Sequence, residues 1–443
     1  MFARPNRRRK ANDIGDTTSN YSSDAESNDR DLSGLQIPDD IPLRLTAVAN
    51  SRIRRSSSNN NLGPSQLMTK LGPTPSSLLG SPIRQQPNGR RSISGSYAQT
   101  IYSQTNSFGV KPFSRKFRHQ SLSSQELLSL LNRSHTSRHS LEASLAELRY
   151  HILAQGINLE DETNPNPAST IRCRAWKALL GVYHVSAGEY IEYVAKGPSS
   201  MYEKVKNDTF RTLATDKKFT NKVQEPMLVR VLNALVWKSK DAPTSGHRFQ
   251  YVQGMNVLAA PFLYVMPELD AFYSFSTFLS FNCPLYVQPS LTGVHCGLKL
   301  MDRCLEVLDP ELFAFLIDKG LSSEIYAFAS VMTFSACTPP LEEVLKLWDF
   351  LLACGVHCNI ICIVAQLMMI RNHLLNSPSP MKILRTFPDL QASPIIQKTQ
   401  ELISKLPEAL YDDLVRHPFD ITVCDKYLDI KSPLGLATHM SID

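Results

Sequence analysis

Cysteine is absent from the first 120 residues of this 443-residue chain, and all nine cysteines lie in the part that follows. The chain also lacks an apolar segment after its basic opening residues, so the sequence predicts no secretory signal. An odd number of cysteines without such a signal is typical of a reducing compartment. We therefore expect free thiols and a cytoplasmic location.

A second absence concerns β structure, because no stretch of alternating apolar and polar residues is long enough to form a sheet. Apolar residues recur instead at helical spacing, and 42% apolar content is enough for a sizeable core. The predicted fold class is all-α. Helices are expected over 124–131, 189–196, 202–210, 225–237, 257–266, 268–282, 296–308, 310–319, 323–335, 340–354, 359–375, 395–403 and 409–415, with a further helix that Ser140 caps.

Neither a glycine-rich phosphate loop nor a nucleophile elbow occurs in the chain. The sequence therefore predicts no nucleotide site of its own. Cys354, Cys358 and Cys362 are spaced by four near His357, and these residue types occur in zinc sites. Ligands on consecutive turns of one helix do not converge tetrahedrally, so small buried side chains are the preferred interpretation. We expect no metal and no cofactor.

The run from Phe350 to Ile370 is uncharged and long enough to span a bilayer. Gly355, His357 and Gln366 interrupt it, and Gly355 is placed to end one helix before another begins. Buried helices of a large bundle have the same composition. We therefore predict two internal helices and no membrane span.

Charge divides the chain near residue 120. Residues 1–120 hold 18 Lys and Arg against 8 Asp and Glu, a net charge of +10, whereas the remainder holds 29 against 33, a net charge of −4. The first part is rich in Ser, Asn, Arg and Pro and has no sustained apolar period, which predicts disorder. The expected parts are a disordered basic tail (1–120), a helical domain (121–430) and a short C-terminal tail (431–443).

The basic tail has two candidate roles. Its opening run from Arg4 to Lys10 could be a nuclear-localisation signal or bind nucleic acid, although such runs are usually only solvated. We expect no nucleic-acid partner. Phosphorylation would reduce its positive charge by ~1.5–2 charges per site. Candidate sites are Thr74 and Ser81, which precede prolines, and Ser58, Ser94 and Ser121, which follow a basic residue by three.

Two polar segments contain the candidate catalytic residues. Asp208 and Arg211 stand three residues apart, so on a helix they share one face. Gln253 and Gly254 stand just before an apolar run, where glycine permits close backbone approach and the amide can orient a water. An arginine that stabilises spreading charge and a glutamine that positions water suit phosphoryl transfer. Each segment alone has a plainer interpretation, as a surface ion pair or a capped turn.

The order of three motifs resembles that of TBC domains. The opening signature corresponds to Arg172–Gly181, which contains Trp176; the Asp-x-x-Arg-Thr segment runs from Asp208 to Thr212; and the Tyr-x-Gln-Gly-Met segment begins at Tyr251 and leads to Asn256. Later landmarks are Leu308–Leu312, Ile325–Tyr326 and Leu345–Gly355, so the resemblance covers roughly Leu141 to Cys424. One departure follows Tyr326, where the family often has a tryptophan and this chain has Ala-Phe-Ala-Ser-Val.

The resemblance implies a multi-helix GTPase-activating domain that supplies two fingers to a partner. Arg211 matches the arginine finger and Gln253 the glutamine finger, so GTP and magnesium belong to the partner GTPase. Among the supporting residues, Asp208 would hold Arg211, and Tyr251, Gly254 and Asn256 would shape the loop that aims Gln253. The supporting set also includes Thr212, Arg172 and Trp176. Apart from the resemblance, Arg172 is expected to be a structural ion-pair partner and Trp176 a core residue.

Within the family, the chain most resembles the fungal checkpoint GAP that restrains mitotic exit and septation. This implies a Ras-like or Rab-like small GTPase as partner, a separate scaffold subunit of a two-component GAP, and a location at the spindle pole body. Three alternatives stay open: a Rab GAP in vesicle trafficking, a non-catalytic TBC scaffold, and a nucleic-acid partner that acts through the basic tail.

Overall fold

The computed structural model describes residues 123–133, 137–157, 166–242 and 250–428 of the chain. Every regular element within these ranges is a helix, which confirms the predicted all-α class. The predicted tails at 1–120 and 431–443, with the candidate phosphorylation sites, lie outside the described residues. The proposed domain boundaries therefore stay predictions.

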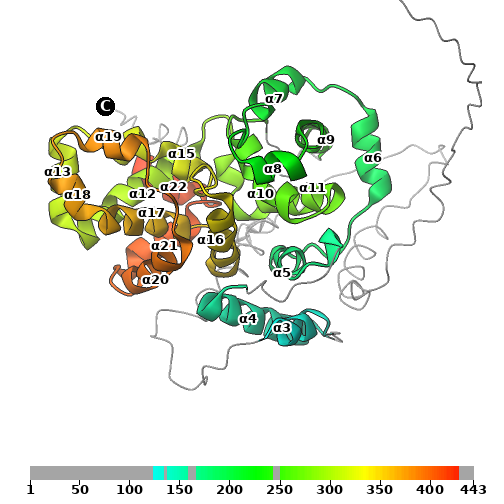
Figure 1. Ribbon diagram of the computed structural model, residues 1–443, viewed down its shortest axis with the longest axis horizontal. Coiled ribbons are helices and arrows are strands. Elements are labelled where there is room, and N and C mark those ends of the chain that lie inside the picture. Colours follow the sequence, from blue (N-terminus) through cyan, green and yellow to red (C-terminus); the bar gives the residue numbers. More distant parts are fainter. Residues whose placement is uncertain (1–122, 134–136, 158–165, 243–249, 429–443) are drawn as a thin grey trace, which may run out of the picture. The chain divides into compact units, whose positions relative to one another are not determined.

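Figure 1 shows the helices of the described residues. In chain order they are α3 (Ser124–Leu131), α4 (Arg138–Gln155), η2 (Pro167–Ser169), α5 (Ile171–Leu180), α6 (Ala187–Ala195), α7 (Tyr202–Thr209), α8 (Lys217–Lys222), α9 (Glu225–Asp241), α10 (Met255–Val265), α11 (Glu268–Thr277), η3 (Phe278–Asn282), η4 (Pro284–Tyr286), α12 (Thr292–Leu308), α13 (Pro310–Asp318), α14 (Ser323–Tyr326), α15 (Phe328–Met332), α16 (Leu341–Cys354), α17 (Cys358–Met369), α18 (Arg371–Leu375), α19 (Pro380–Arg385), α20 (Ala392–Ile403), α21 (Glu408–Arg416) and α22 (Ile421–Leu428).

Helices α7, α9 and α10 pack against one another in the region drawn in green in Figure 1. Val205 of α7, Leu232 of α9 and Leu258 of α10 are each fully buried. The helical spacing that predicted these elements is therefore the spacing of their buried faces. This packing fixes the chain just after α7 relative to the chain just before α10.

An aromatic cluster joins this region to α16. The rings of Trp176 and Trp348 stack with their centroids 5.9 Å apart, and Phe262 lies with its edge toward Trp176 at 5.7 Å. Phe278 stacks on Trp348 at 5.5 Å. Large aromatic side chains in such contacts bury much apolar area, so α5, α10, η3 and α16 share one core.

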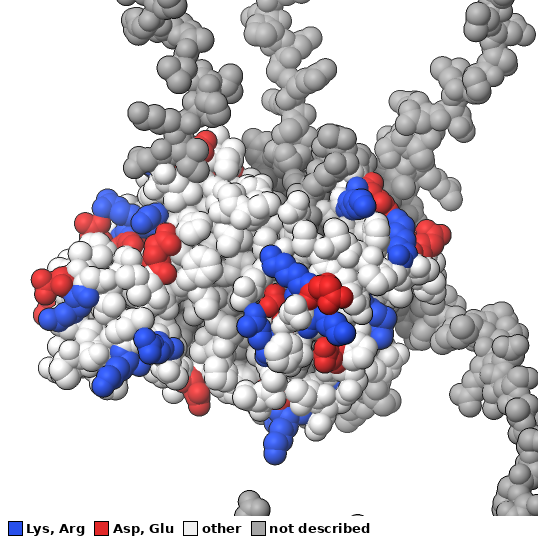
Figure 2. All heavy atoms as spheres, turned by 90° about the horizontal axis from the view of Figure 1, so that it is seen from above, with Lys and Arg blue, Asp and Glu red and all other residues white. Residues whose placement is uncertain are grey.

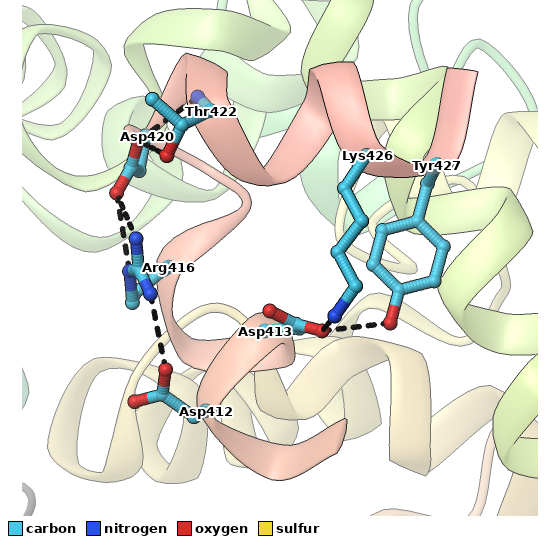
Figure 3. Close-up of polar contacts among 7 residues, drawn as sticks. All are labelled: Asp412, Asp413, Arg416, Asp420, Thr422, Lys426 and Tyr427. Atoms are coloured by element: carbon cyan, nitrogen blue, oxygen red, sulfur yellow. Dashed lines mark hydrogen bonds and ion pairs between the residues drawn. The ribbon is translucent and has the colours of Figure 1, made fainter. Parts of the chain in front are cut away.

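The last two helices are fastened by charged side chains, as Figure 3 shows. Arg416 of α21 donates to Asp412 at 3.2 Å and to Asp420 at 2.6 Å, so it bridges α21 and the turn before α22. Asp413 accepts from Lys426 and from the Tyr427 hydroxyl, both on α22. Because α22 also packs on α12, these contacts close the C-terminal part of the described core.

Several predicted helix boundaries are wrong. The helix expected to be capped by Ser140 begins earlier, at Arg138, because the Ser137 side chain accepts from the Ser140 backbone and forms the N-cap. α9 continues to Asp241, beyond its predicted end at residue 237. The spans 268–282, 323–335 and 359–375 each divide into two elements, and the first of these ends in a π-helical turn. Apolar periodicity continues across such breaks, so it does not reveal them.

The uncharged run that begins at Phe350 divides between α16 and α17 at Gly355, as predicted. No described helix has the length and apolar composition needed to cross a membrane. Cys358 and Cys362 are buried in α17, and Cys354 is partly exposed at the end of α16. Among the described residues, His, Cys, Asp and Glu side chains form no group of three that could hold a metal ion.

Candidate functional site

Arg211 lies just beyond the end of α7. The helix ends at Thr209 with Phe210 as its C-cap, and Arg211 belongs to the turns that lead to α8. The Arg211 guanidinium forms an ion pair with the Asp208 carboxylate, where the side chains are 54% and 8% exposed. The pair expected from the spacing is therefore formed, although Arg211 itself stands outside the helix.

The second segment is a turn that opens α10. Gly254 is the N-cap with a φ of +103°, and a Cβ atom there would lie 3.2 Å from Cγ of Met332 in α15. Both the positive φ and the close approach favour glycine at this position. Gln253, the residue before it, is exposed. The turn therefore presents the Gln253 side chain at the surface.

Buried polar side chains join the two segments. The Tyr251 hydroxyl donates to Asp208 Oδ2 at 3.0 Å. The Asn256 amide nitrogen donates to Thr212 Oγ1 at 2.9 Å and to the Asp208 backbone carbonyl at 3.3 Å. Thr212 Oγ1 donates to the same carbonyl at 3.1 Å. All four side chains are buried, and a satisfied buried network of this kind holds its members in fixed positions.

Asn256 also connects this network to the turn that contains Gln253. Its Oδ1 accepts from the Gly254 backbone N–H at 3.2 Å and lies 3.4 Å from the Tyr251 hydroxyl. One amide side chain thus contacts both the Gln253 turn and the segment that ends in Arg211. The residues brought together are Asp208, Arg211, Thr212, Tyr251, Gly254 and Asn256, and Gln253 is the neighbour of Gly254.

Burial raises the pKa of the Tyr251 phenol well above its ordinary value, and the Asp208 carboxylate beside it raises that pKa further. The phenol therefore stays protonated near neutral pH and remains a donor. Asp208 thus has one oxygen on Arg211 and the other on Tyr251. Because Tyr251 fixes one side of the carboxylate, it also fixes the direction in which Asp208 holds Arg211.

Arg172 and Trp176 lie at a different place, between α5 and α16. Arg172 donates to Asp349 from Nε at 3.0 Å and from a terminal nitrogen at 2.9 Å. Trp176 Nε1 donates to the same carboxylate at 2.7 Å, and the Trp176 side chain is fully buried. The expected structural ion pair and core residue are therefore confirmed. Their partner, Asp349, was not among the predicted residues.

Two residues beside the polar network were also missed by sequence reasoning. The Lys204 ammonium lies 6.0 Å from the centroid of the Tyr251 ring, within cation–π range. Phe210 precedes Arg211 directly and is exposed. The spacing of Lys204 from Asp208, one helical turn, could have indicated their shared face. Phe210 could have been noticed as an aromatic residue within a polar segment.

The arrangement suits chemistry on a molecule brought from outside. A guanidinium carries several donors in a planar fork that matches phosphate oxygens, and an amide can both donate to and accept from a water. One terminal nitrogen of the Arg211 guanidinium is held by a buried carboxylate, while more than half of the Arg211 side chain faces solvent. Fixed yet exposed groups of this kind can act on a bound partner without first being ordered.

Figure 2 shows how charge is distributed over one face of the described residues. Basic and acidic side chains lie beside one another in separate clusters, with uncharged surface between them. A nucleic-acid interface usually has a continuous basic surface instead. This face of the described residues shows no such surface, and the basic tail on which the nucleic-acid alternative rests lies outside those residues.

The family model described as the Rab-GTPase-TBC domain matches residues 169–375 of the chain. Cell division control protein 16 of Schizosaccharomyces pombe is 47% identical over 277 residues, which are 62% of this chain and 89% of that protein. Mitotic check point protein BUB2 of Saccharomyces cerevisiae is 39% identical over 290 residues, which are 63% of this chain and 94% of that protein. The matched family segment contains both Arg211 and Gln253.

A solved structure, the Ypt/Rab-GAP domain of Gyp1p, superposes on the chain with a TM-score of 0.50. It is 15% identical and covers 64% of this chain and 98% of that domain. At this identity the likeness concerns the fold alone.

Proposed function

Because this chain belongs to the Rab-GTPase-TBC domain family of GTPase-activating proteins, we propose that it supplies Arg211 and Gln253 in trans to a Ras-like or Rab-like small GTPase. In this proposal the chain accelerates hydrolysis of GTP that the partner binds. The nucleotide and its magnesium ion belong to that partner.

The observation that carries the proposal is the shared anchoring of the two candidate fingers. Asp208 contacts Arg211 directly, and Asn256 links the Asp208 backbone to the Gly254 backbone beside Gln253. Two surface residues 42 positions apart in the sequence are thus set on one buried network. A surface ion pair and an unrelated capped turn would have no reason to share it.

Each finger would have a separate task during hydrolysis. The Arg211 guanidinium would stabilise the negative charge that spreads over the transferred phosphoryl group and the leaving oxygen. The Gln253 amide would orient the attacking water and so replace the glutamine of the GTPase itself. An arginine supplied in trans is worth ~10³–10⁵ in rate, because the isolated GTPase lacks this charge stabilisation.

The test is single-turnover GTP hydrolysis with the purified chain and a panel of GTP-loaded small GTPases from the same organism. With the responsive GTPase, Gln253→Ala should slow hydrolysis strongly. Mutating the switch glutamine of the GTPase should matter far less than Gln253→Ala. Dependence on the GTPase's own glutamine alone would contradict the role of Gln253.

Matched controls separate catalysis from general damage. Arg303 on α12 forms an exposed ion pair with Glu306 at the same three-residue spacing as Asp208 and Arg211. Gln397 is an exposed glutamine on α20. Arg303→Ala and Gln397→Ala should both hydrolyse GTP at the wild-type rate. If the wild-type chain activates none of the GTPases, either alone or with its co-purifying partner, the non-catalytic TBC scaffold becomes the better proposal.

We extend the proposal to restraint of mitotic exit or septation as part of a spindle checkpoint. The names of the two relatives, a cell division control protein and a mitotic check point protein, support this assignment. The proposal includes a scaffold subunit that holds the chain and its GTPase together at the spindle pole body.

The measurement that tests this part compares hydrolysis by the purified chain alone and with its co-purifying partner, alongside imaging of the tagged chain through mitosis. Activation that increases with the partner, together with staining at spindle poles, is expected. Full activity alone with vesicular staining would favour the Rab GAP of vesicle trafficking.

A further inference from the structure

Phe210 is the most exposed large apolar side chain among the described residues, at 65%. It is the C-cap of α7 and directly precedes Arg211. Exposing a large aromatic ring to water is unfavourable, and single exposed apolar residues are otherwise common on protein surfaces. The position of Phe210, and not its exposure alone, is therefore what requires an explanation.

The backbone around Phe210 is held on both sides. Thr209 before it and Thr212 after Arg211 are both buried, and their hydroxyls donate to the backbone carbonyls of Lys206 and Asp208 at 3.1 Å each. Phe210 and Arg211 are thus two adjacent exposed residues on a fixed turn. A backbone that is already ordered loses little conformational freedom when a partner binds.

Any partner that reaches Arg211 must also approach Phe210. Consecutive Cα atoms are about 3.8 Å apart, so both side chains start from nearly the same point on the surface. A GTPase whose nucleotide contacts the Arg211 guanidinium would therefore cover the Phe210 ring. Covering that ring removes apolar surface from water and so favours binding.

The chain around this turn is basic, although the body of the protein is not. Residues 202–222 contain six Lys and Arg and three Asp and Glu, a net charge of +3, whereas residues 121–443 have a net charge of −4. Lys204 is exposed and lies over the Tyr251 ring, so it stands at the same site. A locally basic surface complements an acidic partner, including one that carries GTP.

We propose that Phe210 is the apolar anchor of the GTPase-binding surface and that Lys204 forms part of its basic rim. The occupant is the GTP-bound small GTPase, so the inference rests on the proposed function. On the partner, Phe210 would enter an apolar depression beside the nucleotide, and Lys204 would face acidic groups. Phe210 then sets affinity for the GTPase, while Arg211 and Gln253 set the rate of the chemical step.

Steady-state kinetics with the responsive GTPase separate these roles. Phe210→Ala should raise KM for the GTP-bound GTPase about 10- to 30-fold, as loss of a central interface aromatic does, while kcat changes less than about threefold. Phe210→Leu should give an intermediate KM because it keeps part of the apolar area. The thermal midpoint should stay at the wild-type value, since the ring packs little against its own chain.

Ile191 on α6 provides the matched control, because it is 62% exposed and apolar. It lies outside the finger network, which consists of the polar side chains that join the Arg211 and Gln253 segments. Ile191→Ala should leave both KM and kcat unchanged. Lys204→Glu should raise KM at low salt, and this increase should shrink as ionic strength rises. The increase in KM caused by Phe210→Ala should persist at high salt, because salt does not screen apolar contacts.

The outcomes distinguish this inference from the proposed function. If Arg211→Ala abolishes activation but Phe210→Ala has the wild-type KM, Phe210 is no anchor and the proposed function stands. If Phe210→Ala lowers kcat and leaves KM unchanged, Phe210 only positions Arg211, which also overturns the inference. If Arg211→Ala is as active as the wild type, the proposed function fails and the inference fails with it.

Discussion

Two aspartate–arginine pairs in this chain have the same chemistry and opposite surroundings. Asp208 and Arg211 are three residues apart, and more than half of the Arg211 side chain is exposed. Asp349 and Arg172 are 177 residues apart, and their side chains are 2% and 12% exposed. Arg172 contacts both carboxylate oxygens of Asp349, whereas the Arg211 pair uses one oxygen of Asp208 and leaves the other to Tyr251.

The difference between the pairs lies in what each aspartate serves. Asp349 receives Arg172 and the Trp176 indole, so its charge is neutralised inside the contact between α5 and α16. Asp208 is also buried, but it holds an arginine more than half of whose side chain is exposed. Removing one member of a buried pair destabilises the fold, whereas an exposed pair contributes little stability. The Asp349–Arg172 pair therefore contributes to stability, whereas the Asp208–Arg211 pair leaves a charged side chain at the surface.

The largest expected effect comes from replacing Arg211 and Arg172 with alanine, one at a time, and measuring GTP hydrolysis and unfolding for each variant. Arg211→Ala should reduce single-turnover GTP hydrolysis by about 10³–10⁵, because its role is in the transition state. It should lower the free energy of unfolding by only about 1–3 kcal/mol, because one oxygen of the Asp208 carboxylate loses its donor. Arg172→Ala should keep hydrolysis within about threefold of the wild type, at temperatures where it remains folded. Equal hydrolysis with Arg211→Ala and wild-type protein would remove the distinction between the pairs.

Lysine substitutions sharpen this first comparison. Arg211→Lys should restore little of the hydrolysis rate, because an ammonium cannot form the planar fork that a guanidinium places across two oxygens. Full rescue by lysine would mean that a point charge is enough.

Next in size is the stability loss of Arg172→Ala. This substitution should lower the free energy of unfolding by about 3–5 kcal/mol, since it leaves the buried Asp349 carboxylate without its charge partner. Urea unfolding followed by circular dichroism measures the change. Arg303→Ala, which removes an exposed arginine from a surface pair, should change the free energy by less than about 1 kcal/mol.

The stability loss should also depend on pH. Burial raises the pKa of Asp349 above its ordinary value of 3.8, while Arg172 and Trp176 oppose that rise. A carboxyl whose folded pKa is raised favours the folded state when protonated, and this contribution is lost as pH rises through the folded pKa. Without Arg172 the folded pKa should be higher still. The difference in the free energy of unfolding between wild type and Arg172→Ala should therefore become smaller as pH falls from about 7 toward 4. A difference that stays constant over this range would contradict burial as the cause.

A smaller effect is expected for Tyr251→Phe, which removes one hydrogen bond from the network around Arg211. The free energy of unfolding should fall by about 1–3 kcal/mol, because an oxygen of the buried Asp208 carboxylate loses its donor. Hydrolysis should slow by about tenfold through kcat, since Arg211 is then less firmly directed. Tyr202→Phe, at the first turn of α7, is the control and should change neither quantity. An unchanged kcat in Tyr251→Phe would show that Asp208 holds Arg211 without this help.

The smallest effect is expected for removal of residues 1–120. A truncated chain that begins at Ser121 should keep the wild-type hydrolysis rate, because the finger network and the Asp349 pair lie wholly after that point. Charge changes in the tail should alter localisation or regulation instead. Loss of cooperative unfolding in the truncated chain, measured by thermal denaturation, would show that the tail belongs to the folded domain.

The amount that could be predicted differs between the two pairs. The Asp208–Arg211 pair could be predicted because its members are one helical turn apart, so local geometry brings them together. Arg172 could be recognised as a structural residue, but its partner could not be named. Periodicity tells which side of a helix is buried and does not tell which other helix covers it.

The sequence by itself determined the all-helical class and the break at Gly355, because each depends on residues within a few turns of one another. The candidate fingers came from the resemblance of its motifs to those of TBC domains. Only the tertiary structure decided that Asn256 would bridge the two finger segments, that Asp349 would receive both Arg172 and Trp176, and that Phe210 would remain exposed. These outcomes depend on which helices pack together across long sequence separations. Packing of that kind is set by the fit of whole faces, and no local spacing records it.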